Sequence, residues 1–234
     1  MVQSNAVLTH QAFVTKNQEP DCINHVALFD SLTSFQKNQI KPLLHLKHYK
    51  HGENLYSPGQ KADAFYIVKS GMLRIYRLGD TGKEQLIRMI PDGAFTGELA
   101  LFKTGVYEAF AEAKTDCYVW SISRSDIQAL LAQYPEIALY MLSTLSERLS
   151  SSEQQTAWAT TETVKDRLFH FLTTLVHSKE NDPIVELDMA KKELASYLGT
   201  TSESISREFS HLIKENKIAE VSCRKFKLLN FSLY

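Results

Sequence analysis

The chain has 234 residues, which is long enough for two domains that each bury a hydrophobic core. Its formal net charge of −1 excludes a global positive field, so any contact with nucleic acid must come from a local basic patch. The residues 1–20 lack the features of a secretory signal, no stretch reaches the roughly 18 apolar residues of a membrane span, and the three cysteines lie far apart. We therefore expect a cytoplasmic protein with no membrane contact and no structural disulfides.

Short strands dominate the chain from about His45 to Ser123. A helix is expected just before them, over 32–44. The runs rich in β-forming residues are 65–68, 72–77, 85–90 and 117–122. Turn signals separate the strands at 51–52, 57–59, 69–71, 79–82 and 91–93. Strands at this regular spacing predict a small barrel or jelly roll.

A long helix is predicted to start at Pro135 and to continue to about Trp158. It carries more apolar side chains than one barrel face needs. These are Ile137, Tyr140, Met141, Leu142, Leu145 and Leu149. The surplus favours a seam between two copies of the chain, and the alternative is that the stripe packs only on its own barrel. A further helix starts near Val164, and 181–183, Asn-Asp-Pro, is expected to interrupt it.

Two short helices joined by a tight turn are predicted between Leu194 and Ile213. Gly199 can take the left-handed conformation that ends the first helix, and Thr201 or Ser202 can cap the second. The predicted inward stripe of the second helix is Ile205, Phe209, Leu212 and Ile213. After it, residues 217–231 resemble a β-hairpin, with apolar positions at Ile218, Val221, Phe226, Leu228 and Leu229.

The start of the second helix is polar, which suits a helix that reads DNA in the major groove. The candidate DNA-binding residues are Thr201, Ser202, Glu203, Ser204, Ser206 and Arg207. Arginine can donate two hydrogen bonds to guanine, and glutamate can accept one from the cytosine amino group. Lys225, in a basic cluster with Arg224 and Lys227, is a candidate phosphate contact. An ordinary helical hairpin with a solvated face is the alternative that spacing alone leaves open.

The order of these parts resembles the Crp/Fnr superfamily of bacterial transcription regulators, the family of the cyclic-AMP receptor protein and the fumarate–nitrate reduction regulator. Residues 52–71 are similar to the first barrel glycines of that family, and 95–101, Phe-Thr-Gly-Glu-Leu-Ala-Leu, to its effector cassette. The resemblance implies an α+β fold with a cyclic-nucleotide-binding-like β-barrel (jelly roll), a long dimerisation helix and a C-terminal winged helix-turn-helix. The implied domains are an N-terminal arm at 1–24, the effector domain at 25–134, the dimerisation helix at 135–160 and the DNA-binding domain at 161–234.

The resemblance also implies an effector pocket in the barrel. Its candidate residues are Gly97, Glu98, Leu99, Glu108, Ala109 and Ser152. Members that bind cyclic AMP hold its phosphate with an Arg-Ser pair, but the corresponding segment 105–111 is one residue short and carries Glu108 instead. Glu153 on the long helix would add a second carboxylate. We therefore expect cyclic AMP to bind poorly, and Glu98 to act mainly as a turn residue that satisfies barrel amides.

The second helix resembles the Fnr-like branch, whose Glu-x-x-Ser-Arg pattern is matched by Glu203, Ser206 and Arg207. The resemblance implies an inverted repeat with half-sites similar to TTGAT. The branch's iron–sulfur cysteines are absent apart from Cys22, so no cluster and no other cofactor is expected. Cys22 and Cys117 could form a redox pair, although Cys117 is more simply a small buried side chain in an apolar strand.

The sequence thus predicts a homodimeric, sequence-specific transcription regulator. Its expected partners are palindromic double-stranded DNA, a second copy, RNA polymerase, and an unidentified small-molecule or redox effector. The alternative is a cyclic-nucleotide-type sensor module that regulates a protein partner. No enzyme is expected, since no nucleophile–base arrangement, metal-ligand set or phosphate-binding glycine loop is present in the needed context.

Overall fold

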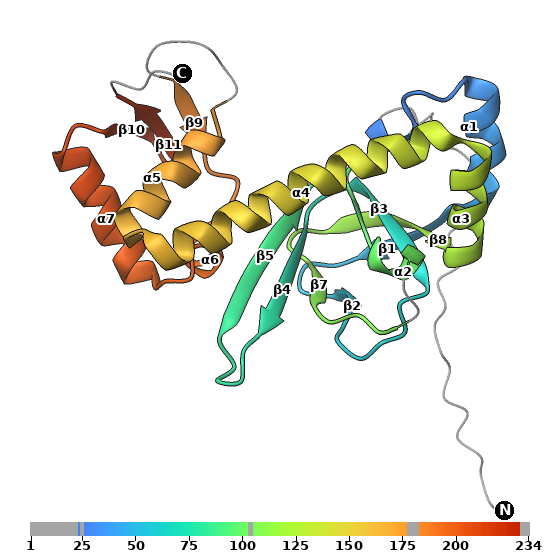
Figure 1. The fold of residues 1–234 in the computed structure, drawn as a ribbon, viewed down its shortest axis with the longest axis horizontal. Helices are drawn as coiled ribbons and strands as arrows, with labels where there is room; N and C mark the ends of the chain where they lie inside the picture. The colour runs from blue at the N-terminus through green and yellow to red at the C-terminus, as the bar shows by residue number, and fades with distance from the viewer. Residues whose placement is uncertain (1–22, 24–25, 103–104, 177–182, 230–234) are drawn as a thin grey trace, which may run out of the picture.

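The computed structural model describes residues 23, 26–102, 105–176 and 183–229. A β-barrel and a C-terminal helical domain are joined by one long helix that runs along the barrel (Figure 1). The prediction of an α+β fold with a barrel, a long helix and a winged helix-turn-helix is confirmed. Among the described residues, no helix is both long and apolar enough to cross a membrane.

The barrel consists of two four-stranded antiparallel sheets. One sheet has the order β1-β8-β3-β6, with β1 His45–Tyr49, β8 Cys117–Ser123, β3 Ala64–Ser70 and β6 Phe95–Thr96. The other has the order β2-β7-β4-β5, with β2 Asn54–Tyr56, β7 Phe110–Ala113, β4 Leu73–Leu78 and β5 Glu84–Ile90. Strands β4 and β5 form a long hairpin that projects from the barrel (Figure 1). The four predicted strand runs correspond to β3, β4, β5 and β8.

Short helices cover one end of the barrel. They are η2 Ala27–Phe29, α1 Ser34–Ile40, η3 Lys41–Leu43, α2 Leu99–Phe102 and α3 Arg124–Gln133. The α-helix predicted over 32–44 is shorter, because Thr33 caps it in a capping box with Gln36 and Pro42 begins a separate 3₁₀ turn. Phe29, Phe65 and Phe95 lie in the core beneath these helices.

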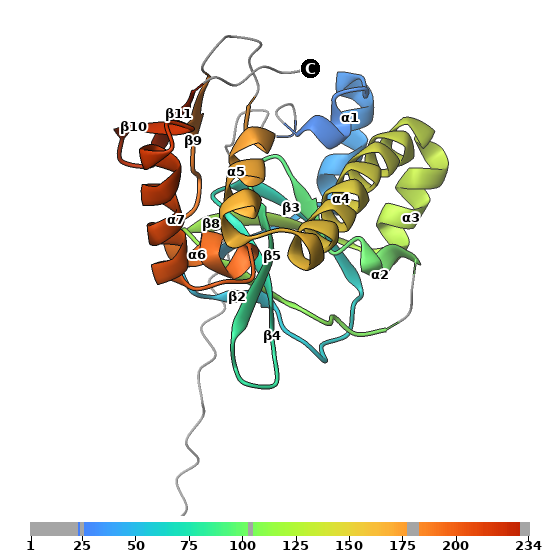
Figure 2. The same ribbon diagram turned by 60° about the vertical axis from the view of Figure 1, so that its left-hand side comes forward.

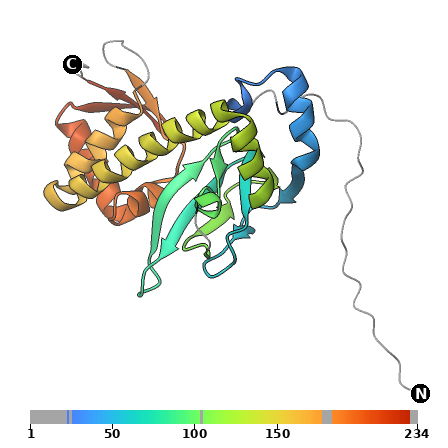
Figure 3. The ribbon, with the colours of Figure 1, turned by 45° about the vertical axis from the view of Figure 1, so that its right-hand side comes forward.

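The long helix is α4 Pro135–Thr161, three residues longer than predicted. Ile137 and Met141 are buried and pack into the core of the barrel. Leu142 and Leu149 are 58% and 60% exposed, so the apolar stripe is only partly covered within one chain. Figure 3 shows α4 crossing from the barrel to the C-terminal domain. Packing on the barrel thus accounts for Ile137 and Met141, whereas the seam between two copies stays a prediction for the exposed residues.

The C-terminal domain packs three helices on a small antiparallel sheet. Its elements are α5 Val164–Thr174, β9 Ile184–Glu186, α6 Lys191–Tyr197, α7 Ser202–Lys214, β10 Ile218–Ser222 and β11 Lys225–Leu228. The sheet order is β10-β11-β9, so the predicted hairpin is present and gains a third strand that the sequence analysis missed. The prediction that Ile213 faces inward is wrong, since it is 38% exposed, and Val221, a predicted apolar position of the hairpin, is 53% exposed. α5 ends at Thr174, and the predicted break at Asn181 and Asp182 lies outside the described residues.

The C-terminal domain contacts the barrel through α6, which packs against β5 (Figure 2). The Ser196 hydroxyl accepts a hydrogen bond from Leu86 N at 2.7 Å and donates one to Glu84 O at 2.8 Å. Lys114, which follows β7, forms an ion pair with Glu193 of α6. Hydroxyl-to-backbone hydrogen bonds and a half-buried ion pair therefore fix the position of the helix-turn-helix relative to the barrel.

Candidate nucleic-acid interface and effector cavity

The turn between α6 and α7 has the geometry of a helix-turn-helix. Gly199 has φ +69°, the left-handed conformation that glycine adopts readily after a helix end. Thr201 caps α7, because its hydroxyl accepts a hydrogen bond from Ser204 N at 3.2 Å. The Thr201 hydroxyl also donates to Ser204 Oγ at 3.1 Å, so two of the candidate DNA-binding hydroxyls contribute to the cap.

α7 separates an apolar face from a polar one. Ile205, Phe209 and Leu212 are buried in the core of the C-terminal domain. Glu203, Ser206 and Arg207 are exposed on the outer side, whereas Ser202 and Ser204 are half-buried. Within the described residues, neither Glu203 nor Arg207 forms an ion pair or a side-chain hydrogen bond. These two charged groups are therefore available to an external partner.

The start of α7 lies beside a groove of about 790 Å³ between the two domains. Thr201, Ser202 and Glu203 line one side of this groove, and the barrel residues Arg74 and Glu84 line the other. Arg74 is itself held by Glu112 and Glu84 at 3.0 and 2.9 Å. The barrel thus lies close to the first turn of the helix, while Ser206 and Arg207 do not line this groove.

Lys225, the candidate phosphate contact, lies on β11 of the wing. Its ammonium group is 3.0 Å from a carboxylate oxygen of Glu186 on β9, and both side chains are about half exposed. The neighbouring Arg224 has φ +64° at the turn between β10 and β11. A phosphate at Lys225 would therefore compete with Glu186.

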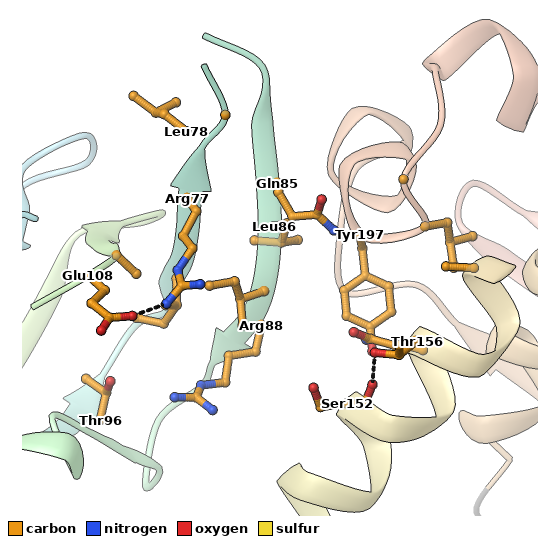
Figure 4. Close-up of a pocket in the computed structure, with 18 of the residues that line it drawn as sticks. Arg77, Leu78, Gln85, Leu86, Arg88, Thr96, Glu108, Ser152, Thr156 and Tyr197 are labelled. Carbon is orange, nitrogen blue, oxygen red and sulfur yellow. Dashed lines mark hydrogen bonds and ion pairs between the residues drawn. The ribbon is translucent and has the colours of Figure 1, made fainter. Parts of the chain in front are cut away.

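A cavity of about 860 Å³ lies between the barrel, α4 and the helix-turn-helix (Figure 4). All six residues predicted for the effector pocket line it. They are Gly97, Glu98, Leu99, Glu108, Ala109 and Ser152. Gly97 has φ +85°, and a Cβ there would lie 2.7 Å from Ala64 O, so the close approach of two backbone segments requires glycine. Glu153 is exposed and does not line the cavity.

Glu98 is buried beneath two arginines. Its carboxylate accepts a hydrogen bond from Arg88 of β5 at 2.7 Å and lies 3.4 Å from an Arg148 nitrogen of α4. Arg148 also donates to Phe95 O at 2.7 Å and lies over the Phe95 ring. Burial lowers the pKa of Arg148, Glu98 raises it, and the positive charge of Arg88 lowers it further. Glu98 is therefore part of a buried charge cluster rather than a turn residue that only satisfies amides.

The other carboxylate at the cavity, Glu108, is bound by Arg77 of β4 at 2.5 Å, on the more exposed side (Figure 4). Tyr56 and Tyr107 stack with ring centroids 3.8 Å apart. Burial raises the pKa of Tyr56 to about 12, so its hydroxyl stays protonated at neutral pH. The sequence analysis missed Arg88 and Arg77. A signal was present, since two arginines on adjacent strands flank the glycine turn at 79–82.

Cys117 is fully buried in β8. Its sulfur lies within hydrogen-bonding distance of Met72 O and Thr115 O, at 3.2 and 3.1 Å. This environment is that of a small buried side chain, as expected. Cys22, the other half of the possible redox pair, lies outside the described residues. The redox pair therefore stays a prediction that these contacts do not test.

Comparisons with known proteins agree with this arrangement. Residues 46–134 match the family model of the cyclic nucleotide-binding domain, and 166–232 match that of the Crp-like helix-turn-helix domain. The probable transcriptional regulator flp of Lacticaseibacillus casei is 32% identical over 209 residues, which cover 89% of this chain and 94% of flp. The cyclic AMP receptor protein of Thermus thermophilus is 26% identical over 170 residues, covering 73% and 77%. A CooA mutant from Carboxydothermus hydrogenoformans has a similar fold, with a TM-score of 0.75, 19% identity, and coverage of 90% and 92%.

Proposed function

The chain belongs to the Crp/Fnr family of transcriptional regulators, and from this premise we propose that two copies of it together bind one palindromic DNA site with half-sites similar to TTGAT. The observation that carries the proposal is the exposed face of α7, where Ser206 and Arg207 lie one helical turn after Glu203. The apolar residues of α7 face the opposite way. This separation suits a helix that packs on its own domain and enters the major groove.

Each residue of this face has a distinct role in the proposal. Arg207 donates two hydrogen bonds to guanine O6 and N7, and Glu203 accepts one from a cytosine amino group. Ser206 adds a hydroxyl contact between them. The wing supplies a phosphate contact through Lys225, which fixes the position of the domain on the duplex without reading sequence.

The exposed part of α4 supports the dimer. Leu142 and Leu149 are seven residues apart, Leu145 lies between them, and this is the heptad spacing of a two-helix seam. Large apolar side chains that are more than half exposed on one helix face favour burial against a partner. A twofold dimer would place two α7 helices in successive major grooves, about 34–36 Å apart.

We propose further that an effector binds in the barrel cavity and that it is not cyclic AMP. Glu98 and Glu108 both line the cavity, and an Arg-Ser pair for a cyclic phosphate is absent from 105–111. A phosphodiester placed there would meet two carboxylates whose arginines are already engaged. Contact with RNA polymerase stays a prediction from the resemblance.

Fluorescence anisotropy with a labelled TTGAT palindrome tests the proposal. We expect specific binding that is at least 1,000-fold tighter than binding to a scrambled duplex of the same composition. The affinity should be unchanged by cyclic AMP at millimolar concentration. Equal affinity for both duplexes would favour the alternative, a sensor module that regulates a protein partner.

A further inference from the structure

The outer face of α7 continues beyond the three residues proposed to read bases. His211 lies four positions after Arg207, so it occupies the same face one helical turn further along. Its side chain is 51% exposed, whereas the neighbouring Phe209 and Leu212 are buried in the core. Figure 2 shows α7 at the outer edge of the C-terminal domain. The imidazole of His211 is therefore accessible to the same external partner as Arg207.

The imidazole of His211 is held by a carboxylate of its own helix. Its Nδ1 atom lies 2.9 Å from Glu208 Oε2, and the Glu208 side chain is only 16% exposed. An ionised carboxylate only accepts hydrogen bonds, so Nδ1 carries a proton in this contact. Nε2 forms no hydrogen bond within the described part of the chain. Glu208 thus fixes one ring nitrogen and leaves the other available to a ligand.

This arrangement makes the chemistry of Nε2 depend on pH. In the neutral ring Nε2 has a lone pair and accepts hydrogen bonds, whereas in the imidazolium both ring nitrogens donate. Histidine is the side chain whose charge ordinarily changes between about pH 5 and pH 8. A phosphate oxygen is a charged acceptor, so it binds the imidazolium and gains nothing from the neutral ring with its proton on Nδ1.

The charged groups around the imidazole come from α7, α5 and the segment before β10. By helical spacing Arg207 and Lys214 are its neighbours on α7. Lys165 of α5 binds Glu215 at 2.6 Å, and this hydrogen bond and the charge of the imidazole both lower the pKa of Glu215. Lys217 lies 3.7 Å from the same carboxylate. α6 and β10 also pack on α7, but among the described residues they bring no ion pair or hydrogen bond to the imidazole.

We propose that protonated His211 bridges Glu208 and a phosphate oxygen of duplex DNA, so that DNA affinity rises as the pH falls. The inference rests on the proposed DNA-binding function of α7 and adds a contact to it. Residues at the start of such a helix meet base edges, and His211 lies about 6 Å further along the axis than Arg207. A phosphate contact carries no sequence information, so the pH effect should be the same on any duplex.

Fluorescence anisotropy tests the contact on the full-length protein, with the TTGAT palindrome and the scrambled duplex at about pH 6 and about pH 8. We expect wild type to bind both duplexes about fivefold more tightly at the lower pH. His211→Gln should lose most of this pH response, because an amide does not titrate, and should match wild type at the higher pH. His211→Arg is charged at both pH values and should bind tightly at both.

His170 provides a matched control in the same domain. Its Nδ1 atom lies 2.9 Å from Glu162 Oε2 and its side chain is 43% exposed, so its contact resembles that of His211. It lies instead on α5 near the end of α4, beside the Trp158 ring. His170→Gln should therefore leave the pH response of DNA binding unchanged. Circular dichroism and the melting temperature of each variant at both pH values establish that it is folded.

Glu208→Gln tests the other end of the bridge. A neutral amide attracts the imidazolium less than a carboxylate does, so the pH response should become smaller. Affinity at the higher pH should not fall, because the change removes a negative charge beside the DNA. A pH response as large as that of wild type would contradict the bridge.

Salt dependence separates a phosphate contact from a structural role of His211. One phosphate contact adds about one to the slope of log affinity against log salt. The slope for wild type should therefore be steeper at the lower pH, and this difference should vanish in His211→Gln and persist in His170→Gln. An affinity of His211→Gln that falls equally at both pH values would overturn the inference. A pH response confined to the palindrome would also overturn it, because it would assign His211 to a base.

The two duplexes distinguish this inference from the proposed function. Sequence-specific binding whose pH response survives in His211→Gln contradicts the phosphate contact alone. A pH response that depends on His211, together with equal affinity for both duplexes, contradicts the proposed sequence-specific function alone. Binding to neither duplex contradicts both.

Discussion

The barrel cavity and α7 use the same residue types in opposite ways. In the cavity, Glu98 is almost fully buried and is held by two arginines. On α7, Glu203 and Arg207 are exposed and pair with nothing within the described residues. Buried charges must be compensated inside the protein, whereas exposed charges can stay free for a partner. The charges of the cavity therefore stabilise the fold, whereas those of α7 are accessible to a second molecule.

The largest effect is expected from removing the shared carboxylate in the cavity. Glu98→Ala leaves Arg88 and Arg148 without their common partner in a partly dehydrated site, and it should lower the free energy of unfolding by about 3 kcal/mol. Urea denaturation measures this change. Glu108→Ala is the matched control, because that side chain is 69% exposed and its loss should cost less than about 1 kcal/mol. If both variants lost the same free energy of unfolding, burial of the carboxylate would not determine its contribution to stability.

Disrupting the α4 seam should have the next largest effect, on DNA binding. Leu142→Asp combined with Leu149→Asp places charges on the exposed apolar stripe and should give monomers by analytical ultracentrifugation. Affinity for the palindrome should fall about 100-fold, because the two half-sites are then bound independently. Gln154→Asp, on an exposed position of the same helix outside the stripe, serves as the control. A double variant that remains dimeric would refute this assignment of the seam.

Removing the guanidinium of Arg207 from α7 tests the exposed charges directly. Arg207→Ala should cost about 1–3 kcal/mol on the TTGAT palindrome and much less on random DNA. Lys214→Ala, at the far end of α7, should change the two affinities by a similar small factor. Competition titrations measure both, and a uniform loss for Arg207→Ala would reduce this residue to a phosphate contact.

The contact between the domains provides a smaller test. Duplex DNA must place its backbone on both sides of α7. The barrel faces the first turn of α7 across a groove with a volume of only about 790 Å³, which leaves little room for the duplex. We therefore expect Ser196→Ala, which removes two hydrogen bonds to β5, to raise DNA affinity about three- to tenfold. Ser121→Ala removes a hydroxyl contact within the barrel and should leave DNA affinity unchanged. Lower DNA affinity for Ser196→Ala would mean that the contact supports the DNA-binding arrangement.

The smallest effect is expected at the wing. Lys225→Ala should weaken binding to specific and random DNA alike, by less than about 1 kcal/mol. The effect is small because Lys225 must give up its ion pair with Glu186 to bind a phosphate. The slope of log affinity against log salt should fall by no more than about one. A change in base preference would instead assign Lys225 a reading role.

Local signals in the sequence were sufficient for the helix-turn-helix, because its features depend on residues a few positions apart. Gly199, the Thr201 cap and the buried Ile205 and Phe209 follow from helical spacing. A motif predicts the residues that line the cavity but not their ion pairs, since Arg88 approaches Glu98 only when β5 packs beside the turn at Gly97. Such contacts depend on how distant segments pack together, and a single sequence does not show that packing.

The same reasoning explains the smaller errors. β9 is three residues long and becomes a strand only by pairing with β11, so its local pattern is too short to predict. Ile213 and Val221 fit the apolar period of their elements, but no other described element covers them. The Ser196 contact with β5 joins residues more than 100 positions apart.

A double-mutant cycle between protein and DNA tests the central claim most directly. Binding is measured for wild type and Arg207→Ala, each on the TTGAT palindrome and on a palindrome with the guanine replaced by adenine in both half-sites. The account predicts strong non-additivity, with the base change costing wild type about 1–3 kcal/mol per half-site and costing Arg207→Ala almost nothing. Additive losses, with the base change equally costly to both proteins, would contradict base reading by Arg207 and with it the proposed function of this face.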